Sequence, residues 1–246
     1  MNNLKGLELY ATESAFKTRE LILSNPTIAY IEESNKTYIR PRCSIRLVYD
    51  IQDSVNQITH IFNHLGDSAY RVISMSVDGV VLDQPVTGYT FNTTGQHIVR
   101  AIFEYKSGSF QILDNYQSNN ELVEVKFEDK YSINGGYITL HDYGFYNGNA
   151  LNKVTKLDLM EFPFNYSNQT RKPELDLMTS KFPNLEALIM PKNMKPSSVG
   201  FYFTPQTNFK GTVFLPKSGD YMSYITKYTF PNATKIYYDK DGNIDA

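Results

Sequence analysis

The chain has 246 residues, of which 41% are hydrophobic and 20% are charged, an ordinary composition for a globular protein. Its formal net charge of −2 excludes a general electrostatic attraction to nucleic acid or anionic membranes, and its single cysteine, Cys43, excludes an intrachain disulfide. The 19 tyrosines and 15 phenylalanines favour a mainly β fold, because aromatic side chains fit pleated, half-buried surfaces.

Residues 1–41 are predicted to form a first, N-terminal module. The segment Ser14–Leu23 fits either a helix or a strand, since short apolar runs do not separate the two. Thr27–Ile31 and Thr37–Ile39 flank polar turn residues and predict a hairpin. Pro41 marks a boundary, because the residue before a proline is restricted to extended conformations.

The start of the chain has no basic segment followed by an apolar stretch, so we expect no signal peptide. No apolar run is long enough to span a bilayer. We therefore expect a protein that is made in a cytoplasm and that leaves the cell, if at all, by a route other than secretion.

Residues 42–115 are predicted to form a small β-sandwich, because short apolar segments alternate with turn residues at regular intervals. Asp78-Gly79 indicates a hairpin turn, since glycine tolerates a positive φ. The expected strands are Ser44–Ile51, Ala69–Val77, Val86–Phe91, His97–Tyr105 and Phe110–Leu113.

Residues 116–246 repeat one spacing of apolar residues, Φ-x-x-Φ-x-Φ. The middle apolar residue falls at 125, 157, 188, 213 and 236, so successive copies are 32, 31, 25 and 23 residues apart. Self-similarity at such periods predicts an irregular array of stacked strands in which each unit buries its apolar face against its neighbours. The copies are Leu122/Val125/Phe127, Val154/Leu157/Leu159, Leu185/Leu188/Met190, Val213/Leu215 and Ala233/Ile236/Tyr238.

Parts of both modules resemble a known combination of domains. Ile45–Asp50, Val77–Val81 and Tyr89–Arg100 resemble an immunoglobulin-like module, which often precedes BspA-like leucine-rich repeats in gut Bacteroidetes and their phages. Asp142–Asn147, followed by Val154–Leu159, is similar to one unit of those repeats. The resemblance implies an immunoglobulin-like β-sandwich followed by a short leucine-rich-repeat-like array.

The end of the array is similar to the closing unit of the same family. Thr212–Tyr224 and Ala233–Tyr238 carry this likeness, which covers roughly residues 42–105 and 136–238 with the earlier motifs. The chain departs from the family where Gly211-Thr212 replaces the usual leucine before Val213.

The resemblance implies a structural protein of a crAss-like tailed bacteriophage, of the capsid-decoration or head-fibre type. Such a protein is part of the virion, is released by lysis, and needs no export signal. The resemblance also implies that residues 1–41 are an N-terminal anchoring arm that attaches the chain to the particle. We expect it to bind capsid or other virion proteins and copies of itself, to bind no nucleic acid or membrane, and to have no enzymatic activity. The alternative is a bacterial cell-surface adhesin or carbohydrate-binding module, with a host-surface glycan as its ligand.

No residues with the spacing of a catalytic, cofactor or metal site stand out. His60 and His64 are four residues apart, but no further ligands accompany them, so we place them in a polar loop or short helix. We interpret Cys43 as a small core residue and not a nucleophile. We expect His97 and His141 to be surface or capped histidines, not catalytic bases.

The tail Asp239–Asp245 alternates oxygen donors as calcium-binding loops do. However, Gly242 is at the fourth position of the tail and not the sixth, and no bidentate glutamate follows. We therefore interpret the tail as a solvated chain end.

Exposed aromatic residues are the candidates for an interaction surface, since tyrosine and phenylalanine are enriched at protein interfaces. In the array, the alternative is that alternate members fill the core. The candidates are Tyr30, Tyr38, Phe201, Tyr202, Phe203, Tyr221, Tyr224 and Tyr228.

Overall fold

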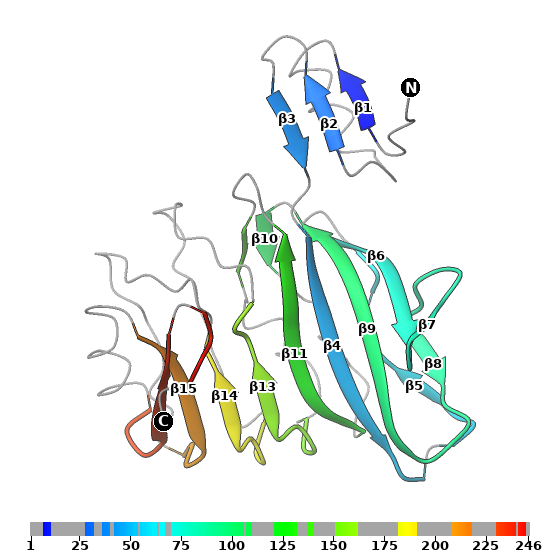
Figure 1. Ribbon diagram of the computed structural model, residues 1–246. Helices are drawn as coiled ribbons and strands as arrows, with labels where there is room; N and C mark the ends of the chain where they lie inside the picture. The colour runs from blue at the N-terminus through cyan, green and yellow to red at the C-terminus, as the bar shows by residue number, and fades with distance from the viewer. Residues whose placement is uncertain are drawn as a thin grey trace.

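The fold was analysed in a computed structural model. It describes residues 7–10, 28–31, 36–39, 42–53, 55–62, 64–66, 70–105, 107–109, 121–131, 137–139, 151–161, 182–190, 208–217, 230–239 and 241–244. Within these ranges the fold is mainly β, as predicted, and its largest element is a nine-stranded mixed sheet with the order β16-β15-β14-β13-β11-β4-β9-β6-β7 (Figure 1).

One half of this sheet is antiparallel. It consists of β4 (Arg42–Ile51), β6 (Tyr70–Val77), β7 (Val80–Val81) and β9 (Gly95–Tyr105). The predicted strands of this region are confirmed, and so is the hairpin between β6 and β7. Its turn residues Asp78 and Gly79 have φ values of 49° and 83°, the left-handed conformations that a two-residue hairpin turn requires.

A second, two-stranded sheet lies against the apolar face of the antiparallel half. It pairs β5 (Ile58–His60) with β8 (Gly88–Thr90). Phe91 directly follows β8, and its ring centroid is 5.7 Å from that of Tyr49 in β4. β5 was not predicted, and because His60 is its last residue, the placement of His60 in a loop or short helix was wrong.

The other half of the large sheet contains the predicted array. β11 (Leu122–Tyr131) is followed across the sheet by β13 (Lys156–Asp158), β14 (Ala187–Ile189), β15 (Thr212–Pro216) and β16 (Thr234–Tyr238). Each pairs in parallel with its neighbour. The five copies of the apolar spacing therefore lie side by side, as predicted.

The register of the array follows the apolar spacing over four of its five strands. Val125 is opposite Leu157, Leu157 is opposite Leu188, and Leu188 is opposite Val213. For the fifth strand the predicted alignment was wrong by one residue, because Val213 is opposite Lys235 and not Ile236.

The shifted register of β16 has a visible consequence for two tyrosines. Tyr237 packs against the hydrophobic core. Tyr238 is fully buried, and its hydroxyl donates a hydrogen bond to the carbonyl oxygen of Met190 at 2.5 Å. This hydrogen bond holds the last strand to the unit that carries β14.

Each of three units begins with a tight turn that was not predicted. The backbone amides of Val154, Leu185 and Ala233 bond to the carbonyl oxygens three residues earlier, at 3.2, 3.1 and 3.4 Å. The residue that opens each turn is buried in the core. These residues are Leu151, Phe182 and Phe230. The repeated unit is thus a turn and a short strand, not a strand alone.

A single hydrophobic cluster joins the two halves of the sheet. It extends from Cys43 in β4 to Ala233 before β16. β11 is beyond the predicted boundary at residue 115, yet it is antiparallel to β4 and parallel to β13. Phe103 of β9 and Phe127 of β11 are in edge contact with ring centroids 6.4 Å apart. The array therefore continues the sheet of the preceding module.

Two smaller sheets complete the described structure. β2 (Ile28–Ile31) and β3 (Lys36–Ile39) form the predicted antiparallel hairpin, and β1 (Leu7–Tyr10) pairs in parallel with β2. β10 (Ser107–Ser109) pairs in parallel with β12 (Tyr137–Thr139). The predictions for Ser14–Leu23, Phe110–Leu113 and His141 fall outside the described residues.

Candidate functional site

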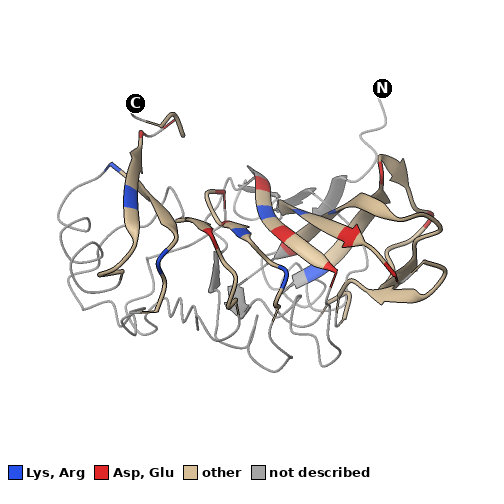
Figure 2. Cartoon of the chain, turned by 90° about the horizontal axis from the view of Figure 1, so that it is seen from below, with Lys and Arg blue, Asp and Glu red and all other residues tan. Residues whose placement is uncertain are grey.

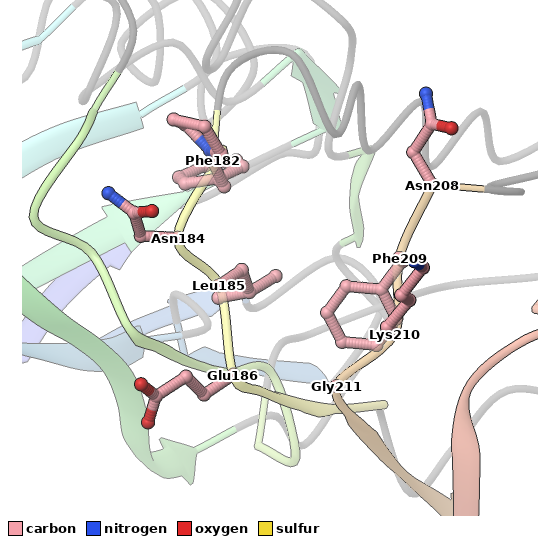
Figure 3. Close-up of a pocket in the computed structure, with 9 residues that line it drawn as sticks. Phe182, Asn184, Leu185, Glu186, Asn208, Phe209, Lys210 and Gly211 are labelled. Atoms are coloured by element: carbon pink, nitrogen blue, oxygen red, sulfur yellow. The ribbon is translucent and has the colours of Figure 1, made fainter.

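A pocket of about 780 Å³ opens between the unit that carries β14 and the unit that carries β15. One wall is the segment 182–186 before β14, and the other is the segment 208–211 before β15 (Figure 3). We call it the inter-unit pocket. Its volume is within the range of sites that bind small molecules or short peptides.

The inter-unit pocket arises where the unit of β15 is shorter than the unit of β14. Phe182 precedes its strand residue Leu188 by six positions, whereas Phe209 precedes the paired residue Val213 by four. The chain before β15 must therefore reach its strand by a more direct path.

Gly211 makes this direct path possible. A Cβ atom at Gly211 would lie within 2.4 Å of the backbone oxygen of Glu186, so no other residue fits without a backbone shift. The next amide, that of Thr212, donates to the same oxygen at 2.7 Å. This close approach explains why Gly211-Thr212 replaces the leucine that the repeat pattern leads one to expect.

The floor of the pocket is apolar. Phe182 and Phe209 are 3% and 5% exposed, and Phe209 makes an edge contact with Phe230 at a centroid distance of 5.9 Å. Figure 3 shows the side chains of Leu185 and Phe209 pointing toward each other from the two walls. Among the described residues that line the pocket, Phe182 and Phe209 are therefore too buried to offer an open aromatic face.

The rim of the pocket is polar and exposed. It carries Asn184, Glu186, Asn208 and Lys210. The side-chain amide nitrogen of Asn184 donates to the carbonyl oxygen of Asn152 at 2.6 Å and so joins adjacent turns. The carboxylate of Glu186 points away from Phe209 in Figure 3. The inter-unit pocket was not predicted from the sequence, because Phe209 lies outside the repeated apolar spacing.

Two of the predicted interaction residues lie in described strands. Tyr30 lies in β2 opposite Thr37, and Tyr38 lies in β3 opposite Ala29. The other candidates fall outside the described residues, and their role stays a prediction. They are Phe201, Tyr202, Phe203, Tyr221, Tyr224 and Tyr228.

His97 is buried and capped at both ring nitrogens, which is one of the two placements expected for it. Its Nδ1 is 2.7 Å from Asp78 Oδ2 and its Nε2 is 3.0 Å from the carbonyl oxygen of Thr93. Burial lowers the pKa of His97, but these hydrogen bonds outweigh it, and the pKa is raised. The contact with Asp78 fastens the β6–β7 turn to β9.

The remaining sequence candidates have structural roles. Cys43 is fully buried in the hydrophobic cluster, as expected of a small core residue. His60 and His64 are half-buried, and no group of three or more metal-binding side chains occurs in the described ranges.

The tail is a closed turn at the surface, which agrees with the predicted solvated chain end. Asp239 Oδ1 accepts the backbone amides of Asp241 at 2.8 Å and Asn243 at 2.9 Å, and Oδ2 accepts the side-chain amide of Asn243 at 3.0 Å. These hydrogen bonds, chiefly those from Asn243, lower the pKa of Asp239. Ile244 then forms an antiparallel bridge with Tyr238 at the end of β16.

Charged residues of both signs lie along the middle strands of the sheet (Figure 2). They alternate with core residues, so they occupy the face opposite the core. Glu124 of β11 is 3.2 Å from Arg46 of β4 and 3.4 Å from Lys156 of β13. Arg100 of β9 is 3.1 Å from Glu128 of β11. Alternating charges on adjacent strands stabilise this register and give the middle of the described face no single sign.

Toward the array the same face becomes buried. Burial raises the pKa of Asp158, although its carboxylate accepts the amide of Met160 at 3.0 Å. Burial also raises the pKa of Tyr238, and the nearby carboxyl groups of Asp158 and Glu161 add to this shift. Both groups are therefore held in a packed part of the molecule.

Comparison of this chain with models of known families, with curated proteins and with solved structures gave no match. In the part of the chain that the structure describes, no helix has the length and apolar character needed to cross a bilayer.

Proposed function

We propose that this chain is a non-enzymatic structural protein of a tailed-phage virion, of the capsid-decoration or head-fibre type, that acts by protein–protein binding. The observation that carries the binding role is the inter-unit pocket on a continuous nine-stranded sheet. The two halves of the sheet share one hydrophobic cluster. Such a scaffold holds a binding surface in a fixed position, which lowers the entropic cost of association.

The virion assignment rests on the resemblance of residues 42–105 and 136–238 to an immunoglobulin-like module followed by leucine-rich-repeat-like units. In this proposal residues 1–41 anchor the chain to the particle, while the array presents its binding surface. Symmetric particles multiply a single interface, so we expect many copies and contacts between them.

The test is co-sedimentation. Virions from a culture that produces this protein are purified on a density gradient, and the chain is quantified by mass spectrometry against the major capsid protein. We expect a fixed stoichiometry in the infectious fraction that survives a high-salt wash. A chain found only in the soluble lysate contradicts the virion assignment.

A further inference from the structure

We propose that the inter-unit pocket binds an extended peptide segment of a partner protein, with one aliphatic side chain of the peptide inserted between Leu185 and Phe209. This inference rests on the proposed protein-binding function and names the chemistry of the partner.

The apolar floor selects for an uncharged side chain. Leu185 is half-buried and faces Phe209 across the opening (Figure 3). A peptide side chain that enters here removes the remaining exposed apolar surface of Leu185 from water, which is the favourable term in most peptide recognition. A charged side chain would lose its hydration and gain no partner on this floor.

The polar rim selects for a peptide main chain. Asn184 and Asn208 are exposed on opposite walls of the pocket. Each side-chain amide offers a carbonyl acceptor and N–H donors, the same pair of groups that a peptide unit presents. Within the described ranges no hydrogen bond engages the Asn208 amide, so it is available to an extended segment.

The charge on the rim adds a preference for an acidic peptide residue. Lys210 is exposed and Glu186, the other charged residue of the rim, points away from Phe209 (Figure 3). A peptide carboxylate beside the aliphatic anchor would lie near the Lys210 ammonium group. Exposed ion pairs contribute little, so we expect this preference to be weaker than the aliphatic one.

A sugar is the poorer occupant. Stacking on a sugar ring needs an accessible aromatic face, but Phe182 and Phe209 are only 3% and 5% exposed. Their rings pack inward and serve as the floor. The amides on the rim alone would bind a sugar weakly, in competition with water.

The experiment is a display selection of random ten-residue peptides on the full chain. We expect enriched sequences with one Leu, Ile or Val next to Asp or Glu. The best peptide is synthesised with a fluorescent label, and its Kd is measured by fluorescence polarisation. We expect Asn208→Ala to weaken binding about three- to tenfold, as loss of one hydrogen bond does. Lys210→Ala should weaken it by up to about fivefold.

Asn92→Ala is the matched control, because Asn92 is an exposed amide in the connection between β8 and β9. It should leave the Kd unchanged. The altered side chains are exposed, so each variant should keep the wild-type circular dichroism spectrum. A peptide whose aliphatic residue is replaced by alanine should bind at least tenfold more weakly.

Three results would overturn the inference. They are no enrichment over uncoated beads, peptides that bind the Asn208→Ala variant as tightly as the wild type, and maltohexaose binding that the same variants weaken. The virion assignment is tested separately. A chain that co-sediments with virions but selects no pocket-dependent peptide loses this inference alone. A chain that selects such peptides but is absent from virions loses only its proposed location.

Discussion

The two halves of the nine-stranded sheet reach one core by different means. β4 and β9 face each other over ten residue pairs, from Arg42 and Glu104 to Ile51 and Gly95. By contrast, β13 and β14 share three pairs. A three-residue strand has little stability alone, so each unit depends on the buried residue of its own turn and on its neighbours. Long strands specify the antiparallel half, and repetition of a short unit specifies the array.

Removing a core side chain from each half should separate these two modes most strongly. Leu47→Ala and Leu188→Ala each truncate a buried leucine, and each should lower the free energy of unfolding by about 2–5 kcal/mol. Hydrogen exchange should differ between them. Leu188→Ala should speed exchange in β14–β16 and spare β4 and β9, whereas Leu47→Ala should speed it in both halves. Equal patterns would show that the sheet opens as one unit.

A methyl group at Gly211 tests the close backbone contact in the short unit before β15. Gly211→Ala places a Cβ atom against the backbone oxygen of Glu186, so we expect a loss of about 1–3 kcal/mol in urea unfolding. Gly88→Ala is the control. Its Cβ would meet the Ile58 side chain at 2.8 Å, and Ile58 is 70% exposed and free to move. A loss at Gly211 no larger than that at Gly88 contradicts the close-approach explanation.

The hydroxyl of Tyr238 tests how the last strand is held. Tyr238→Phe removes the hydrogen bond to the Met190 carbonyl oxygen and should cost about 0.5–1.5 kcal/mol in thermal or urea unfolding. Tyr237→Phe is the neighbouring control, since its half-buried ring packs on the core without such a bond. Should both variants match the wild type, the bond contributes nothing to the array.

The smallest expected effect on stability comes from His97 in the antiparallel half, and it depends on pH. The pKa of His97 is raised in the folded chain, so its contribution to stability is complete below the unfolded pKa of about 6.5 and is lost as pH rises through the higher folded value. The charged group that faces the ring is Asp78. We expect urea unfolding of His97→Gln to lack this decrease. If the stability of the His97→Gln variant still decreases as pH rises, the decrease comes from another titrating group.

The array was predictable because its signal is local. Apolar residues two and three positions apart mark each copy, and the structure stacks the copies in sequence order. The turn at Asp78-Gly79 was predictable for the same reason, since the two residues themselves favour positive φ. Each of these features is determined by a few consecutive residues.

What the sequence did not reveal depends on contacts between distant segments. β5 has three residues, one of which is the exposed Ile58, so it carries no strand pattern of its own. The register of β16 is set by β15 and by the bond from Tyr238 to Met190. The inter-unit pocket depends on Gly211 passing over Glu186, which only the paired strands reveal.

The closed turn of the tail limits how far the sheet extends. The carbonyl oxygen of Tyr238 accepts the amide of Lys217 next to β15, so the following amide, that of Asp239, faces the outer edge of β16. There it bonds to the carbonyl oxygen of Asn243 at 3.0 Å. A strand from another molecule would have to displace this turn before it could pair at the end of β16. The turn therefore disfavours edge-to-edge pairing with another molecule at the end of β16.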